Sequence, residues 1–110
     1  MTAEEIKNAT LDSLQQAVVK MTSPEWELYN GDAEKLLGKV QKARVKLENA
    51  QLAKIEQALI TNEKNLTDGK TNLDNALTDL KNVQNVIDNV TAFLKIVIRI
   101  LAVVGRAAAA

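Results

Sequence analysis

Residues 59–101 read LITNEKNLTDGKTNLDNALTDLKNVQNVIDNVTAFLKIVIRIL, and this stretch carries a seven-residue repeat. Aliphatic side chains occupy its first row without exception: Leu59, Leu66, Leu73, Leu80, Ile87, Leu94 and Leu101. A second row, offset by three residues, becomes aliphatic toward its C-terminal end: Asn62, Gly69, Ala76, Val83, Val90, Val97 and Val104. This spacing is typical of helices that pack along a coiled-coil-like seam. We therefore expect an all-α fold, a bundle with coiled-coil-like packing.

Two interpretations of the chain path within this repeat stay open. Asp68-Gly69 is a turn dipeptide, and Thr71 with Asp74 matches a capping box. These signals favour a long antiparallel helical hairpin that turns near Gly69. The unbroken first row of the repeat also allows one continuous rod.

The rest of the chain adds a helix at the N-terminus. Thr2 and Glu5 match a capping box that opens it, and the apolar stripe of the next long helix changes phase near Leu47. A phase change of this kind indicates a stutter or a change of packing partner. We expect one helical domain over 1–110, with helices over 2–22, 33–67 and 72–105, a short helical connection over 24–30 and a tail over 106–110.

The composition argues against catalysis. The chain has 110 residues, no cysteine and no histidine, and 14 basic residues balance 14 acidic ones. Thiolate and imidazole metal sites, catalytic triads and cysteine nucleophiles are therefore excluded. Gly69-Lys70-Thr71 matches only the last residues of a phosphate-binding loop. We expect no enzyme, no cofactor and no metal.

The C-terminal segment, residues 92–104, is apolar apart from Lys95 and Arg99. It is shorter than the ~20 apolar residues that cross a bilayer, so a transmembrane span is not expected. Lys95, Arg99 and Arg106 fall on one narrow stripe, and the other sides of this helix must be covered by something.

Coverage by a second copy is the leading expectation, which makes the protein a noncatalytic helical assembly module and a homo-oligomer. The expected assembly interface comprises Leu73, Leu80, Val83, Ile87, Val90, Phe93, Leu94, Val97, Ile98, Leu101 and Val104. One alternative is a membrane-associated, pore-former-like protein that inserts residues 92–104. Another is a regulatory binding module for one protein partner. In these alternatives, contacts to a partner or to lipid would come from Trp26, Tyr29, Lys95, Arg99 and Arg106.

A basic helical face is formed by Lys35, Lys39, Lys42 and Lys46. No aromatic residues alternate with these lysines and the net charge is zero, which argues against nucleic acid as a partner and favours a solvated face. The acidic N-terminus lacks the basic region of a secretory signal, so we expect a cytoplasmic protein. Secretion and membrane association stay alternatives.

Overall fold

The computed structural model describes residues 2–22 and 31–109, and of residues 31–33 and 104–109 the backbone alone. This part of the chain contains no strand and five helices: α1 (Ala3–Met21), α3 (Gly31–Asn49), α4 (Leu52–Thr61), α5 (Glu63–Leu77) and α6 (Val83–Ala109). The prediction of an all-α bundle is confirmed. The expected connection over 24–30 lies outside the described residues.

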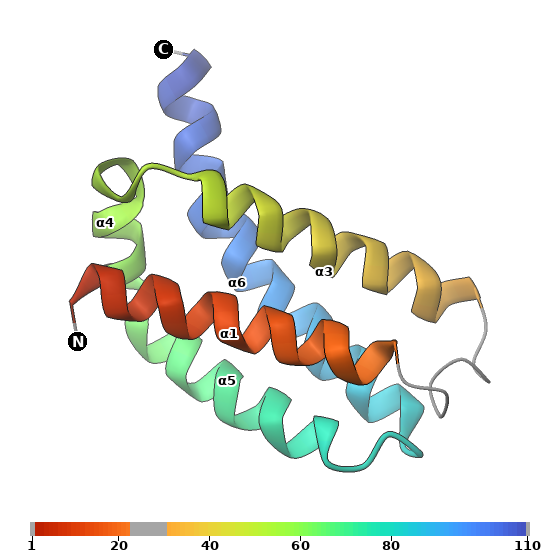
Figure 1. Ribbon diagram of the computed structural model, residues 1–110. Helices are drawn as coiled ribbons and strands as arrows, with labels where there is room; N and C mark the ends of the chain where they lie inside the picture. The colour runs from red at the N-terminus through yellow and green to blue at the C-terminus, as the bar shows by residue number, and fades with distance from the viewer. Residues whose placement is uncertain (1, 23–30, 110) are drawn as a thin grey trace.

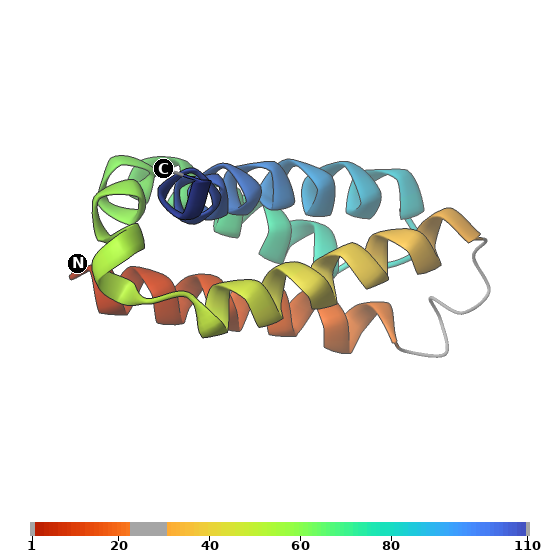
Figure 2. The same ribbon diagram turned by 90° about the horizontal axis from the view of Figure 1, so that it is seen from above.

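Four of these helices, α1, α3, α5 and α6, form a bundle, and the chain has extents of 43 × 27 × 17 Å. Both α1 and α6 pack against α3 and α5, so α3 and α5 are diagonal to each other. Figure 1 shows that α1 and α5 run in one direction and α3 and α6 in the other. The short helix α4 carries the chain across one end of the bundle, from α3 to α5 (Figures 1 and 2).

The N-terminus of α1 has the expected capping box. The backbone N–H of Glu5 donates to Oγ1 of Thr2 over 3.2 Å, and the backbone N–H of Thr2 donates to Oε1 of Glu5 over 3.0 Å. The hydrogen bond from the Thr2 backbone holds the pKa of the Glu5 carboxyl below its ordinary value, and the Thr2 side chain adds to this effect. Two donors at the helix start are thereby satisfied.

The prediction of a single helix over 33–67 is wrong, because the helical structure is interrupted first between α3 and α4. Lys7 reaches from α1 and its Nζ donates to the carbonyl oxygens of Glu48 over 3.3 Å and Ala50 over 3.0 Å. A cation that satisfies the last carbonyls of a helix stabilises its C-terminus. The phase change near Leu47 therefore marks a helix end.

A second break separates α4 from α5 at Asn62, the polar residue of the second row. The backbone N–H of Asn62 donates to the carbonyl of Ala58 over 3.0 Å, and its Nδ2 donates to the same oxygen over 2.8 Å. Asn62 is buried, and these two hydrogen bonds satisfy its donors where α4 bends into α5. The break allows the chain to cross the end of the bundle.

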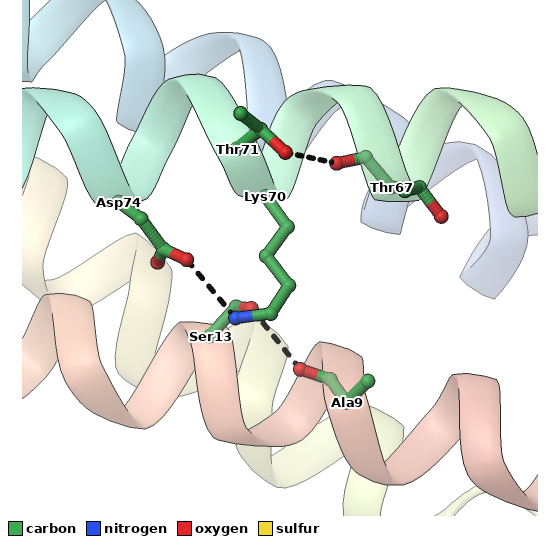
Figure 3. Close-up of polar contacts among 6 residues, drawn as sticks. All are labelled: Ala9, Ser13, Thr67, Lys70, Thr71 and Asp74. Atoms are coloured by element: carbon green, nitrogen blue, oxygen red, sulfur yellow. Dashed lines mark hydrogen bonds and ion pairs between the residues drawn. The ribbon is translucent and has the colours of Figure 1, made fainter.

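The prediction of a hairpin turn near Gly69 is wrong, and so is the alternative prediction of one continuous rod. The helix α5 continues through Gly69, and Thr71 donates to the carbonyl of Thr67 inside this helix instead of capping a new one (Figure 3). A Cβ at Gly69 would lie 3.1 Å from Cδ2 of Phe93 and 3.4 Å from Cδ1 of Ile96. This glycine therefore permits the close approach of α5 and α6.

The hairpin turn lies instead at residues 78–82, between α5 and α6. There Oδ1 of Asp79 accepts from the backbone N–H of Lys81 over 3.2 Å, and Oδ1 of Asn82 accepts from the backbone N–H of Asn85 over 3.4 Å. Short polar side chains of this kind stabilise turns and helix starts. The helix expected over 72–105 accordingly begins at Val83, and it extends through the expected tail to Ala109.

Both rows of the repeat contribute to one hydrophobic core. Leu59, Leu73 and Val97 are at most 1% exposed, and buried residues from all five described helices belong to the same cluster. The side chains of the repeat are thus mostly buried, and they are buried within one chain.

Candidate functional site

The residues expected to form an assembly interface occupy three environments. Six are buried in the core of a single chain: Leu73, Leu80, Val90, Phe93, Leu94 and Val97. Val83, Ile87 and Leu101 are partly buried and pack against that core. Ile98 is 56% exposed, and the side chain of Val104 lies outside the described residues. As folded, the chain leaves little of the expected interface accessible to a second copy.

The residues expected to contact a partner or lipid are only partly described. Trp26, Tyr29 and the side chain of Arg106 lie outside the described residues. Lys95 and Arg99 are exposed on α6, as expected for a solvated stripe.

A hollow of the described surface lies between α3 and α6, and we call it the α3–α6 groove. Its volume is about 660 Å³. The residues that line it are Lys39, Lys42, Ala43, Val45, Lys46, Asn49, Ala50, Ile98, Leu101 and Ala102.

Helical spacing explains how α3 contributes to the groove. Leu36, Val40 and Leu47 point into the core. Lys39 and Lys46 directly precede Val40 and Leu47, so each lies about 100° around the helix from a core residue, on the side that lines the groove with α6. Val45 is 45% exposed although it is aliphatic. The α3 side of the groove therefore combines an apolar side chain with ammonium groups.

The contribution of α6 follows from its length. Figure 1 shows that the C-terminal end of α6 projects beyond the rest of the bundle. Val97 and Ile100 are buried, but Ile98 and Val103 are 56% and 37% exposed because no described helix covers those sides. On the other side of α6, a smaller hollow of about 340 Å³ lies against α4 and includes Lys54, Arg99, Ala102 and Val103 among its lining residues.

The electrostatic character of this end of the bundle is basic. Lys39, Lys42 and Lys46 are all exposed, and within the described residues none of them forms an ion pair. Lys54 and Arg99 add two more cations at the neighbouring hollow. A chain of zero net charge thus concentrates positive charge around the exposed end of α6.

A third hollow, of about 240 Å³, lies between α1 and α5, where Ser13 faces Lys70 (Figure 3). Its polar groups are engaged: Oγ of Ser13 donates to the carbonyl of Ala9 over 3.0 Å, and Lys70 pairs with Asp74 over 3.1 Å. Neither the hydroxyl nor the ammonium is oriented by a neighbouring base or acid toward a bound molecule. This hollow therefore offers apolar packing space and no arrangement for chemistry.

The described residues contain no group of three or more carboxylates that could hold a metal ion. No helix in residues 2–22 and 31–109 combines the length and the apolar character required to cross a bilayer. Comparison with protein-family models, with curated proteins and with solved structures finds no match to this chain.

Some residues of the α3–α6 groove were not singled out from the sequence. Val45, Asn49 and Ala102 carry no motif, and the lysines of α3 were interpreted as a solvated face. One signal was present: Val45 lies off the stripe formed by Val40 and Leu47, which places an aliphatic residue on the polar side of that helix.

Proposed function

We propose that this protein is a noncatalytic interaction module that binds a helix of another protein in the α3–α6 groove. The observation that carries the proposal is the 56% exposure of Ile98, which lies beside the fully buried Val97. An isoleucine left open at the wall of a hollow loses contact with water when a partner binds, and burial of this kind favours association.

The shape of the groove favours a helix as the occupant. On the α3 side the lining extends from Lys39 to Ala50, about 17 Å at about 1.5 Å per residue or about three helical turns, and on the α6 side it extends from Ile98 to Ala102. Val45 and Ile98 supply apolar contacts on its two sides. An amphipathic helix binds such a groove through side chains spaced by three or four residues.

A second copy of the chain is a weaker candidate for the occupant. Self-association through the repeat would require side chains such as Leu94 and Val97, which are core residues of one chain. A two-fold contact through the groove would bring Lys39, Lys42 and Lys46 close to their own copies, and like charges in an interface oppose binding. The proposal therefore favours a different protein over a homo-oligomer.

A membrane surface is a second candidate, favoured by one observation. Lys95 and Arg99 lie on the exposed face of α6 with the exposed Ile98 on one side and Val103 on the other. Cations beside aliphatic side chains suit anionic headgroups. This alternative predicts pelleting with phosphatidylserine vesicles.

The test uses a labelled, uncharged amphipathic helical peptide with leucines spaced by three and four residues, and fluorescence anisotropy as the measurement. We expect binding that weakens about tenfold in Ile98→Ser, because covering the exposed part of this side chain contributes about 1–1.5 kcal/mol. The matched control is Val19→Ser on α1, where an aliphatic side chain is 51% exposed outside the groove, and it should bind like the wild type.

Three results would overturn the proposal. The first is absence of peptide binding. The second is binding that Val19→Ser weakens as much as Ile98→Ser. The third is light scattering that shows a stable dimer that Ile98→Ser dissociates, which would assign the groove to a second copy.

A further inference from the structure

We infer that the helix bound in the α3–α6 groove is acidic on the side that faces α3, with carboxylates spaced to meet the lysines of that helix. This inference rests on the proposed function and specifies the chemistry of the partner.

The spacing of the lysines is the first argument. Lys39, Lys42 and Lys46 are separated by three and four residues, so their ammonium groups follow one edge of α3 along the groove. A partner helix that lies along the groove and carries Glu or Asp at the same spacing would meet each ammonium group in turn. Pairs of this kind at the polar rim of an interface set orientation and speed association.

The absence of local compensation is the second argument. Like charges one helical turn apart destabilise a helix, and within the described residues no carboxylate pairs with any of the three lysines. The one described carboxylate paired on α3, Glu48, is held by Arg44 over 3.5 Å. An acidic partner would relieve this repulsion.

The sign of charge around the groove is the third argument. None of the residues that line it is acidic, and the neighbouring hollow on the other side of α6 adds Lys54 and Arg99. A basic partner helix would therefore be repelled by the lysines of the groove and by the cations of the neighbouring hollow. Repulsion of the wrong partner contributes to binding specificity as much as attraction of the right partner does.

The hollow shape favours an acidic helix over an anionic bilayer. The apolar side chains Ala43 and Leu101 line the groove together with the lysines, and both are less exposed than Ile98. A rod-shaped partner reaches such side chains, whereas a flat surface contacts mainly the residues that project.

The experiment compares three labelled helical peptides that share one leucine face and differ only in their flanking positions, which are Glu, Gln or Lys. At about 0.05 M NaCl we expect the Glu peptide to bind roughly tenfold more tightly than the Gln peptide, and the Lys peptide roughly tenfold more weakly. At about 0.5 M NaCl the differences should shrink several-fold, since screening shortens the range of the charges.

A charge-reversal variant locates the effect. Lys39→Glu, Lys42→Glu and Lys46→Glu together should reverse the order of the Glu and Lys peptides. The matched control changes three exposed lysines elsewhere, Lys20→Glu, Lys64→Glu and Lys81→Glu, and so has the same net charge. It should retain the preference for the Glu peptide.

The outcomes separate this inference from the proposed function. Equal binding of all three peptides, still weakened by Ile98→Ser, would refute the acidic partner and leave the helix-binding groove standing. Failure of all three to bind would refute both. Reversal by the control variant would show that net charge alone decides. Binding to phosphatidylserine vesicles that depends on the three α3 lysines, without binding of the Glu peptide, would assign the basic rim to a membrane.

Discussion

Leu94 and Ile98 lie one turn apart on α6. Replacing each with alanine compares the stability lost at a buried side chain with that lost at an exposed one. Leu94 is 4% exposed within one chain, so Leu94→Ala removes buried methyl groups and leaves a cavity. Such changes cost about 2–5 kcal/mol, and we expect about 3 kcal/mol here. Ile98 is 56% exposed, and Ile98→Ala should change the free energy of unfolding by less than about 0.5 kcal/mol.

Urea unfolding followed by far-ultraviolet circular dichroism measures both changes. With a slope of about 1.5–2 kcal/mol per molar urea, Leu94→Ala should lower the midpoint by about 1.5–2 M, and Ile98→Ala by less than about 0.3 M. Each titration is repeated at about 1 and about 100 μM protein. Because Leu94 contacts its own chain, the midpoints should not depend on protein concentration.

Two results would refute this reasoning. A wild-type midpoint that rises with protein concentration, and ceases to do so in Leu94→Ala, would place Leu94 between chains. A loss of stability in Ile98→Ala as large as that in Leu94→Ala would show that the exposed strip of α6 is covered in solution.

Four further predictions concern local features. Gly38→Ala should raise the free energy of unfolding by about 0.8–1 kcal/mol in the same urea assay, because an added Cβ meets nothing within 4 Å. Gly69→Val should lower the free energy of unfolding by about 1–3 kcal/mol, because the added side chain meets the ring of Phe93. An unchanged stability in Gly69→Val would contradict the close approach of α5 and α6. Lys7→Met should cost about 1 kcal/mol by removing the donor at the last carbonyls of α3, and amide exchange should increase first at that helix end; unchanged exchange there would contradict the role given to Lys7. The pKa of Glu5 is lowered in the folded protein, so the carboxylate stabilises the fold fully above its ordinary pKa of 4.5 and loses this effect as the pH falls through the folded pKa. Glu5→Gln should therefore flatten the acid side of a plot of melting temperature against pH. Identical plots for the variant and the wild type would contradict the capping contribution.

The core was predictable from the sequence because periodicity reports burial directly. The rows that contain Leu59, Leu73 and Val97 are buried as the repeat predicts. What the repeat could not distinguish was burial inside one chain from burial between copies, because both produce the same spacing. The assembly interface expected from the repeat rests on that ambiguity and stays a prediction.

The position of the turn was not predictable from glycine alone. Asp68-Gly69 has the composition of a turn, but Gly69 is a helical residue beside Phe93. The true turn contains neither glycine nor proline, and its signal was the polar pair Asp79 and Asn82, which accept backbone hydrogen bonds. The Asp68-Gly69 dipeptide therefore predicted the turn less well than the polar pair Asp79 and Asn82 did.

The candidate site depends on tertiary structure that the sequence did not specify. Lys42 and Ile98 line one groove only because α4 crosses the end of the bundle and makes α6, not α5, the neighbour of α3. With the turn placed near Gly69, the arms would have paired in a different register. The contact between the lysine-bearing helix and the C-terminal helix was predictable, but the hairpin would have made them antiparallel, whereas α3 and α6 run in the same direction.

The crossover through α4 also bears on the order in which the molecule forms. The helices α5 and α6 are joined by a short turn, whereas all of α4 and α5 lie between α3 and α6 in the sequence. Closing a longer loop costs more chain entropy, so the contact of α3 with α6 should be among the last to form and the first to open. Because the proposed binding groove lies at that contact, we expect it to widen while the other helices stay packed.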